Sequence, residues 1–472
     1  MTKRILGITV LGDFILSEGV EPVIRNLQRA GVTAVACNPT VTAAAEEKTG
    51  SFQPPIDAGS SPRVFDRPLF GQHSLWVRSG VSYQPDPECY QDCTYSPRQP
   101  NDLTANHGHV IGDFVEAAVA AGMKVYFQLG AAQPSGLRDE DRPCGPSGEL
   151  ITGRMADTGS LASEAIRSYN RCYVRDLVNA YPLISGFRID WPEYPCYTFG
   201  EVFQDFSSHV ADWSSRHGFD FSVIRKDVQR FVEYLQGGLT PGSLAPISVA
   251  GSGAMALDET WNRIQESFPG VGQWLELKAA LSTDLIRSWR TAIEESGREE
   301  LELTAHAFMP PYTRLTGLDF AGASLVADSV SPKLYTMHWS LMIKFWGDVL
   351  LQANPSLAET DLVPALVRLT DIADQPAGKR MEDYGYPHPD QPHPVPDAPQ
   401  QRKIAAVREA MNQQASLVPL VHGYGPLEDV HRRLRLVMES AADGVWINRY
   451  GYLSNEKIDM IRVAWGQASR SP

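Results

Sequence analysis

The segment GFRIDWPEYP, residues 186–195, places an arginine and two carboxylates at the end of a short apolar run. Arg188 and Asp190 are two residues apart, so in a β-strand both side chains leave the same face. A guanidinium beside a carboxylate lowers the carboxyl pKa and keeps the group ionised. Glu193 follows, flanked by prolines that stiffen the turn presenting it. One ionised carboxylate and a second carboxyl group of different pKa are what glycoside cleavage requires, so we expect Asp190 and Glu193 to be catalytic.

Most other apolar runs of the chain also end in polar residues, although the bodies of the runs are apolar. One polar end is ordinary, but a ring of polar ends around one opening indicates a pocket. We leave open whether Trp191 is core packing or a platform for a sugar ring, and we include it among the expected substrate-binding residues. The others are Asp13, Asn38, Gln128, Arg188, His306, Lys333, Tyr335, His422, Asn448 and Arg449.

Strand-like runs alternate with amphipathic helical segments along the whole chain. Such alternation predicts parallel strands joined by right-handed crossovers, and eight units are the number that closes a (β/α)8 TIM barrel. In such barrels the active site lies at the C-terminal ends of the strands. An open, doubly wound sheet is the alternative, weakened because no glycine-rich phosphate loop follows the first run. The expected strands are residues 4–12, 32–40, 124–130, 184–190, 301–308, 328–337, 416–425 and 443–451.

The 472 residues are interpreted as one α/β barrel domain, 1–472, with three additions. A long aromatic-rich loop, 41–105, follows the second strand, and its Trp76 is the expected sugar platform. A helical insertion, 218–300, follows the fourth strand, after one helix expected across 199–213. A proline- and histidine-rich loop or lid, 374–400, shows no core pattern.

The net charge of −14 argues against nucleic acid as a partner, because such binding depends on neutralising phosphates. It also argues against an anionic membrane surface, and no apolar run approaches the roughly 20 residues that span a bilayer. The first residues lack the cleavage site of a signal peptide, so we expect a cytoplasmic protein whose six cysteines are reduced. We expect a carbohydrate partner, no cofactor and no resident metal; a homo-oligomer remains open.

The segment GFRID, 186–190, resembles the strand-four motif of the α-amylase superfamily of glycoside hydrolases. The resemblance implies that Asp190 is the nucleophile and Arg188 its partner. The other motifs of that family differ here. No carboxylate stands near His306 on the fifth strand, the segment VHGYG (421–425) has a histidine but no aspartate, and VYFQLG (125–130) lacks the strand-three element.

The wider layout is similar to that of bacterial barrel proteins related to glycoside hydrolases. The segments that carry this similarity are NDLT (101–104), AGMKVYFQ (121–128) and ADGVWINRYGYLS (442–454). The resemblance implies a carbohydrate-active barrel, and we predict a glycoside hydrolase or transglycosylase acting on a small sugar or oligosaccharide.

Two other functions fit the same residues. His306 and His422, together with Asp190 and Glu193, could hold a divalent metal, as in a metal-dependent sugar isomerase or epimerase. A non-catalytic sugar-binding barrel would keep the polar ring and the aromatic side chains and would need no second carboxylate. The missing strand-five acid keeps this second alternative open.

Overall fold

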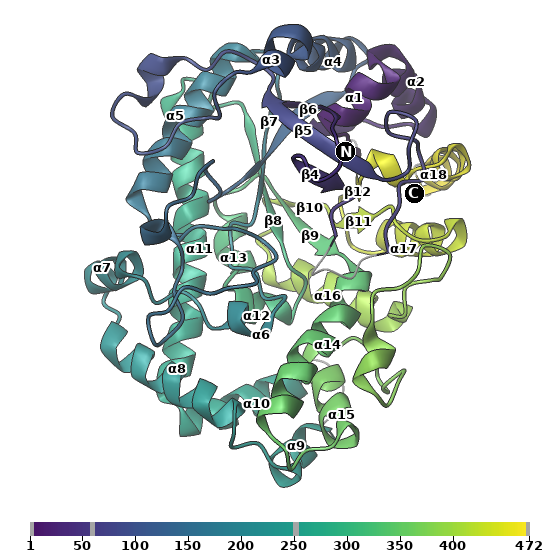
Figure 1. Cartoon of the computed structure of the whole chain (residues 1–472). Helices are drawn as coiled ribbons and strands as arrows, with labels where there is room; N and C mark the ends of the chain where they lie inside the picture. Colours follow the sequence, from purple (N-terminus) through teal and green to yellow (C-terminus); the bar gives the residue numbers. More distant parts are fainter. Residues whose placement is uncertain (1–3, 57–61, 249–253, 469–472) are drawn as a thin grey trace.

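The structure is a computed structural model that describes residues 4–56, 62–248 and 254–468. Its centre is a closed barrel of eight parallel strands surrounded by helices, so the predicted (β/α)8 fold is confirmed (Figure 1). The barrel closes because β8 pairs with β9, and the seventh position is shared by two short strands. The strands are β1 (Ile5–Thr9), β2 (Ala34–Cys37), β6 (Lys124–Gly130), β7 (Gly186–Asp190), β8 (Glu302–Ala307), β9 (Ser329–Leu334), β10 (Ser416–Leu417) with β11 (Leu420–His422), and β12 (Gly444–Asn448).

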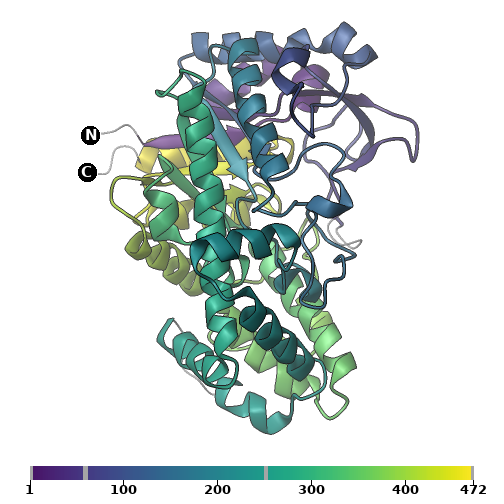
Figure 2. The ribbon, with the colours of Figure 1, turned by 90° about the vertical axis from the view of Figure 1, so that its left-hand side faces the viewer.

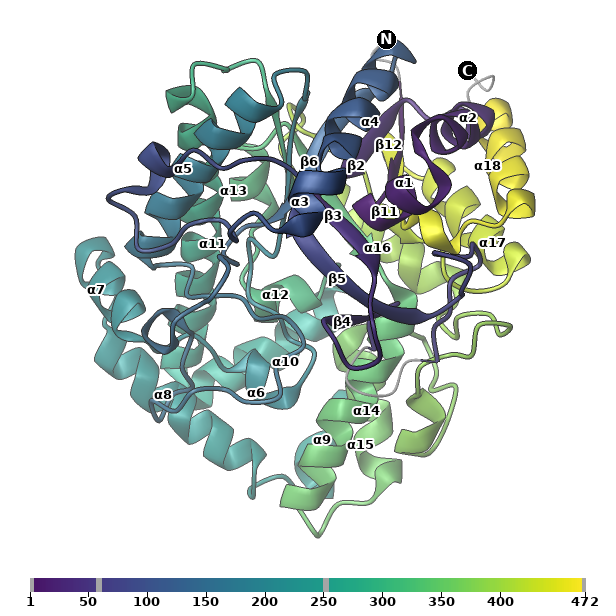
Figure 3. The same ribbon diagram turned by 45° about the horizontal axis from the view of Figure 1, so that its top comes forward.

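An outer ring of helices surrounds these strands, and most successive members of the ring contact one another. The first and last helices of this ring contact each other on one side of the barrel (Figures 1 and 3). None of the described helices is both long and apolar enough to cross a membrane. The ring consists of α2 (Val20–Ala30), α4 (His109–Ala120), α5 (Glu164–Ala180), α11 (Pro269–Glu295), α13 (Phe320–Ser324), α16 (Asp397–Ala410), α17 (Leu427–Met438) and α18 (Asn455–Ala468).

The lower interior of the barrel is filled by large side chains that form a floor for the polar layer above. Tyr126 of β6 and Trp446 of β12 meet edge to face, with ring centroids 5.7 Å apart. Gly7 of β1 makes room for the indole, because a Cβ atom there would lie 2.2 Å from a ring carbon of Trp446. The barrel is therefore packed at this level, and its polar residues gather nearer the C-terminal ends of the strands.

A lobe of helices extends beyond the barrel on one side, and we call it the helical lobe (Figures 1 and 2). The predicted helical insertion after the fourth strand is confirmed and contributes its first three helices. Two helices that follow the sixth strand complete the lobe. The sequence analysis did not predict that these two helices would join the insertion. The long α11 belongs to the outer ring and also packs on α8 and α10. The lobe consists of α8 (Phe221–Leu235), α9 (Pro241–Ser248), α10 (Ala254–Ser267), α14 (Thr336–Ala353) and α15 (Glu359–Thr370).

The segment 41–105 is not simply a loop, which corrects the sequence-based interpretation. It carries most of a three-stranded antiparallel sheet in the order β3 (Thr40–Ala44), β5 (Leu75–Val81), β4 (Ser51–Gln53), set against the barrel in Figure 3. A short helix, α3 (Asp102–His107), ends the segment and begins with an Asn101 capping box. The strands were missed because antiparallel pairing across long turns leaves little local signal in the sequence.

Several expected boundaries were also wrong. The helix predicted across 199–213 is two helices, α6 (Phe199–Val202) and α7 (Ser208–His217). Between them, the Asp205 carboxylate accepts hydrogen bonds from the Cys144 and Ser207 N–H groups, which favours a bend over a continuous helix. The first strand ends at Thr9 because α1 (Gly12–Glu18) begins three residues later.

The proline- and histidine-rich segment 374–400 is packed into the protein rather than being only a solvated lid. It contains a 3-10 turn, η4 (Met381–Tyr384), and the first residues of α16. His393 is buried, and its Nδ1 lies 2.7 Å from the Thr336 hydroxyl at the start of α14. Prolines and histidines hid this packing, because neither residue type marks a core pattern.

Candidate active site

Side chains from three neighbouring strands meet at the C-terminal mouth of the barrel. Asp190 ends β7, and its side chain retains 23% exposure. Lys333 of β9 places Nζ 2.5 Å from Asp190 Oδ1, and His306 of β8 places Nδ1 3.4 Å from the same oxygen. Because β7, β8 and β9 are adjacent, their C-terminal ends converge on one carboxylate. This triad of acid, lysine and histidine is the centre of the candidate site.

The charge of Lys333 keeps Asp190 ionised. Burial alone would raise the pKa of this carboxyl group, but the ammonium of Lys333, with His306, outweighs burial and holds the pKa well below its usual range. Burial and the charge of Arg188 lower the pKa of His306 to about 4, so the imidazole is neutral at neutral pH. Lys333 is therefore the cation that acts on Asp190 under physiological conditions.

Arg188 was expected to be the partner of Asp190, and the structure places it in a deeper layer. Its guanidinium carbon lies 3.7 Å from the centroid of a Trp446 ring, and its Nη2 donates to Ser331 Oγ at 3.0 Å. Residues two apart on a strand share a face but are separated by about 7 Å along it, enough to place them in different barrel layers. Arg188 thus supports the floor of the site, and Lys333 supplies the adjacent charge.

Trp191 packs beside the triad and contacts the lysine. Lys333 Nζ lies 3.5 Å from the centroid of a Trp191 ring, a cation–π contact. The indole is also flanked by Tyr197 and Phe308, with centroids 5.7 and 5.5 Å away. Trp191 has φ of +58°, an unusual value for a bulky residue, which turns the chain sharply after Asp190. Its indole consequently helps to fix the position of the Lys333 ammonium.

Glu193 is fully buried behind this aromatic group. Its Oε1 accepts a hydrogen bond from the Phe308 N–H at 2.5 Å, and its Oε2 accepts one from the Thr316 hydroxyl. Burial raises the pKa of Glu193 to about 7. The carboxyl group therefore links the turn after β7 to the chain after β8 and to α12 (Tyr312–Thr316). The role of Glu193 as proton donor stays a prediction.

A second cluster of polar side chains lies at the ends of the sixth, seventh and eighth strands. Asn448 Nδ2 donates to the Tyr335 hydroxyl at 2.8 Å, and the Tyr335 ring meets His422 edge on at 5.1 Å. The Tyr424 N–H donates to His422 Nδ1 at 3.1 Å, which assigns the proton of a neutral His422 to Nε2. Burial lowers the pKa of His422 well below its usual value, so the ring is neutral at neutral pH.

The residues predicted at the first three strand ends are less closely gathered. Asn38 Nδ2 donates to the Gln128 carbonyl at 2.8 Å, which ties the second strand end to the third. Asp13 is buried within the first turn of α1, so its predicted place at a strand end was wrong. Burial raises the pKa of Asp13 to about 6, against the lowering effect of the Phe14 N–H and of Arg449.

Trp76 lies apart from the strand ends, in the middle of β5. Its ring meets Phe52 of β4 edge on, with centroids 5.7 Å apart, across the small antiparallel sheet. Its exposure is intermediate, so one part of the indole remains open to solvent. The structure gives Trp76 a packing partner, and its use as a sugar platform remains a prediction.

Sequence reasoning missed the residues that support the charged groups. Ser331 and Thr316 were not predicted, although Ser331 stands two residues before Lys333 and so shares its face of β9. Phe308 was missed because its contribution to Glu193 is a backbone N–H group, which no residue pattern reveals. Strand alternation could have identified Ser331, whereas the other two required the tertiary structure.

The described residues contain no group of three or more His, Cys, Asp and Glu side chains placed to hold a metal ion. Two of the four side chains proposed as metal ligands are engaged elsewhere. Glu193 accepts two hydrogen bonds, and His422 Nδ1 accepts the Tyr424 N–H. The arrangement at the mouth thus offers an ionised carboxylate and a cation for polar chemistry.

Comparisons with known proteins agree with the fold. No family model and no curated protein matches the chain. Among solved structures, a β-galactosidase from the psychrophilic Marinomonas ef1 matches with a TM-score of 0.50 and 9% identity, over 98% of this chain and 59% of that one. The catalytic domain of a β-amylase from Paenibacillus polymyxa matches with a TM-score of 0.44 and 9% identity, over 98% of this chain and 97% of that one. This chain thus spans 59% of the length of that β-galactosidase, and the likeness supports the barrel fold.

Proposed function

We propose that the protein is a glycoside hydrolase, or a transglycosylase, that acts on a small sugar or oligosaccharide at the C-terminal mouth of the barrel. The observation that carries the proposal is the Asp190 carboxylate, partly open to solvent and held ionised by Lys333 at 2.5 Å. An ionised, fixed carboxylate can attack an anomeric carbon or stabilise the positive charge that develops there. The mouth of such a barrel is also where substrates bind in this fold.

In this proposal the remaining polar groups of the mouth hold sugar hydroxyls. Tyr335 and Asn448 present a hydrogen-bonded pair, and His422 adds a neutral ring with its proton on Nε2. Such uncharged donors and acceptors orient a polar ligand and give specificity. Asn38, Gln128 and Arg449, from other strand ends, extend the same proposed surface.

The test is hydrolysis of a panel of nitrophenyl glycosides, followed by substitution of Asp190. Asp190→Asn should lower kcat by at least about a thousandfold on any substrate that is turned over, because a neutral amide neither attacks nor stabilises a cation. Asp348→Asn is the matched control, since Asp348 lies on α14 and forms an ion pair with Lys344 at an exposed site. Equal thermal midpoints would show that the variants fold, and a fully active Asp190→Asn protein would remove the proposal.

A second candidate is a sugar-binding barrel without turnover, and the burial of Glu193 favours it. Both oxygens of that carboxyl group are engaged in hydrogen bonds, so a second carboxylate does not face Asp190 from the turn after β7. Calorimetric binding of oligosaccharides without hydrolysis of any panel member would select this candidate. Binding lost in Asp190→Asn would then identify the same mouth as the binding site.

We propose a cytoplasmic location as part of the same hypothesis. All six cysteines are free thiols. The sulfur atoms of Cys93 and Cys172 lie only 3.1 Å apart, and a reducing compartment would keep this pair from forming a disulfide. Cell fractionation tests the location, and light scattering tests whether the protein associates with itself.

A further inference from the structure

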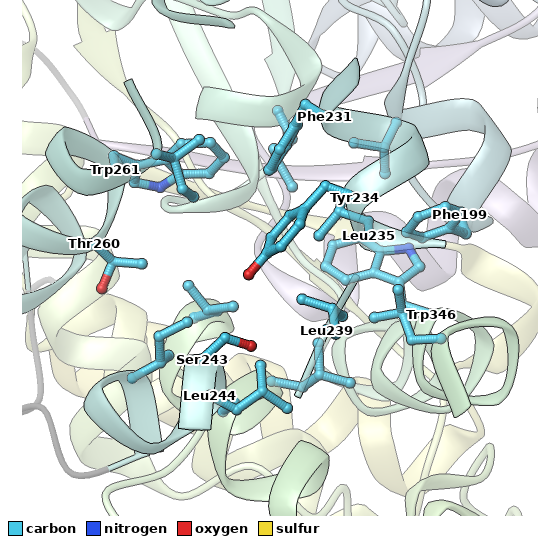
Figure 4. A pocket seen from close by; sticks show the side chains of 18 of the residues that line it. Phe199, Phe231, Tyr234, Leu235, Leu239, Ser243, Leu244, Thr260, Trp261 and Trp346 are labelled. Atoms are coloured by element: carbon cyan, nitrogen blue, oxygen red, sulfur yellow. The ribbon is translucent and has the colours of Figure 1, made fainter. Parts of the chain in front are cut away.

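A cavity of about 420 Å³ lies among the helices of the helical lobe, and Figure 4 shows side chains that line it. Its walls come from α6, from the five lobe helices, from the start of α11 and from the chain around α12. The residues that define it are mainly aromatic or branched aliphatic, among them Phe231, Leu244, Trp261, Trp346 and Leu366.

An aromatic partition separates this cavity from the Asp190 site. Tyr312 lines the cavity, and its ring lies 6.4 Å from that of Phe308. Phe308 in turn packs on Trp191, which carries the Lys333 contact. Tyr312 and Phe308 are both buried, and neither Lys333 nor Asp190 is among the residues that line the cavity. The cavity is therefore a separate site and not an extension of the proposed sugar site.

The lining of the cavity selects an apolar ligand. A cavity of about 150 Å³ lined by aliphatic and aromatic side chains is enough to bind benzene, and this one is nearly three times larger. A volume of about 300 Å³ or more falls in the range of small-molecule sites. The three tryptophans that line it, Trp261, Trp274 and Trp346, add broad flat surfaces against which a hydrocarbon chain packs.

Polar groups in the lining are few and indicate where the polar end of a ligand would lie. Among the described residues that line the cavity, Arg263 of α10 is the charged one, and its side chain is exposed. Figure 4 shows the hydroxyl group of Tyr234 directed into the cavity. An exposed guanidinium beside an apolar cavity matches a ligand with a carboxylate at one end, because the fork of N–H donors binds both carboxylate oxygens.

We propose that this cavity binds an unbranched fatty acid, with its chain among the aromatic and leucine side chains and its carboxylate at Arg263. The site is independent of the sugar chemistry proposed above. The ligand is an amphiphile with a single negative charge, which fits one cation beside an otherwise apolar lining. An alcohol of the same chain length would share the apolar contacts and lack the ion pair.

The test is titration of the purified full-length protein with dodecanoate, followed by tryptophan emission and by calorimetry. We expect saturable binding at one site per chain. Ala365→Phe fills the cavity from α15, where Ala365 is buried, and should weaken binding at least about tenfold. If that variant fails to fold, as judged by its thermal midpoint, Leu244→Trp fills the cavity from α9 instead.

The head-group assignment has its own test. Arg263→Gln should weaken dodecanoate binding about tenfold and leave dodecanol binding unchanged, because only the acid forms the charged hydrogen bonds. Arg462→Gln, at an exposed position on α18, is the matched control and should leave both affinities unchanged. Binding that survives cavity filling would overturn the site, and an Arg263 variant that binds the acid normally would overturn the ligand class.

Discussion

Lys333 keeps the carboxyl group of Asp190 ionised, although burial of that group favours its protonated form. Lys333 is itself almost fully buried, and its ammonium rests on the Trp191 ring. His306 lies at 3.4 Å but is neutral at neutral pH, so it contributes a dipole rather than a charge. The pair formed by Asp190 and Lys333 is therefore the part of the mouth whose loss should change the ionisation of the site most.

Lys333→Met should move the acidic limb of the pH–rate profile upward. The methionine keeps most of the side-chain length and its contact with Trp191 but removes the charge. Without that charge, burial raises the pKa of Asp190 toward or above the ordinary carboxyl value, and each unit corresponds to about 1.4 kcal/mol. We expect the limb to rise by more than about one unit and kcat/KM at neutral pH to fall at least about tenfold.

Lys344→Met is the matched control, because Lys344 forms an exposed pair with Asp348 one turn along α14. That variant should keep the wild-type profile. Removing one partner of a buried ion pair costs stability, about 3–5 kcal/mol, so the thermal midpoint of Lys333→Met should also fall. An unchanged acidic limb would mean that Lys333 does not hold Asp190 ionised.

Glu193 should make the protein less stable as the pH rises from about 4.5 to 7. The usual pKa of the group is 4.5, and burial raises it to about 7 in the folded protein. Within this window the folded chain retains a proton that the unfolded chain releases, so stability falls with increasing pH. The full effect is about 3 kcal/mol above pH 7. Glu193→Gln removes the titrating carboxyl group. The thermal midpoint of this variant should fall less between pH 5 and 8 than that of the wild-type protein.

Glu409→Gln, exposed on α16, should leave the wild-type pH dependence unchanged. The Glu193 variant also tests the predicted proton donor. If Glu193 is the donor, a substrate with a poor leaving group should lose far more rate than one with an activated leaving group. Equal losses would assign Glu193 to positioning, through Phe308 and Thr316.

The sequence allowed the position of Asp190 at the end of its strand to be predicted, but not its charged partner. Asp190 stands at the end of an apolar run, which is a local signal. Arg188 was predicted as the partner because it lies on the same face of the strand as Asp190. Two residues on one face of a strand can still lie in different layers of the barrel interior. Lys333 lies 143 residues further along the chain and two strands away around the barrel, so only the order of the strands brings it within 2.5 Å.

At the scale of secondary-structure elements, α11 carries a buried lysine that joins two short helices near the site. Lys278 Nζ donates to the Val202 carbonyl at the end of α6, at 3.1 Å, and to the Leu315 carbonyl in α12. Its ammonium lies 4.5 Å from the centroid of a Trp274 ring. Because Thr316 of α12 donates to Glu193, Lys278 anchors the helix that holds this carboxyl group.

Lys278→Met should destabilise the protein by about 2–4 kcal/mol, because two buried carbonyl groups lose their donor. The thermal midpoint should fall by several degrees, and calorimetry measures it. Lys226→Met on α8 is the control, since Lys226 is exposed and should leave the midpoint unchanged. If the Lys278 variant is as stable as the wild type, then α6 and α12 are held in place by their apolar contacts alone.

Element boundaries were predictable where local apolar patterns set them and not where side chains capped or bent the chain. The third strand, 124–130, was predicted with its observed limits. The helix expected across 199–213 broke at Asp205, whose carboxylate accepts backbone N–H groups from two segments. The small sheet of β3, β5 and β4 was missed because antiparallel pairing over long turns leaves little local signal.

At the scale of the whole molecule, closure of the barrel converts eight scattered strand ends into one mouth. The count of eight alternating units predicted this closure correctly. The helical lobe could not be predicted as one body, because α14 and α15 follow the sixth strand whereas α8, α9 and α10 follow the fourth. Its cavity arises only where these two parts of the chain pack together.

Chelation should leave turnover unchanged, which distinguishes the proposed hydrolase from a metal-dependent isomerase. A catalytic metal would need ligands from several strand ends at once. Three of the four side chains considered for that role have other partners. Asp190 is paired with Lys333, both oxygens of Glu193 accept hydrogen bonds, and His422 Nδ1 accepts the Tyr424 N–H. Hydrolysis by carboxylates needs no metal. Initial rates should therefore be equal after dialysis with and without EDTA, at equal thermal midpoints.

Activity that disappears with EDTA and returns with Mn²⁺ or Co²⁺, but not with Mg²⁺, would contradict this expectation. It would assign the mouth to an isomerase in which Lys333 releases Asp190 to bind the metal.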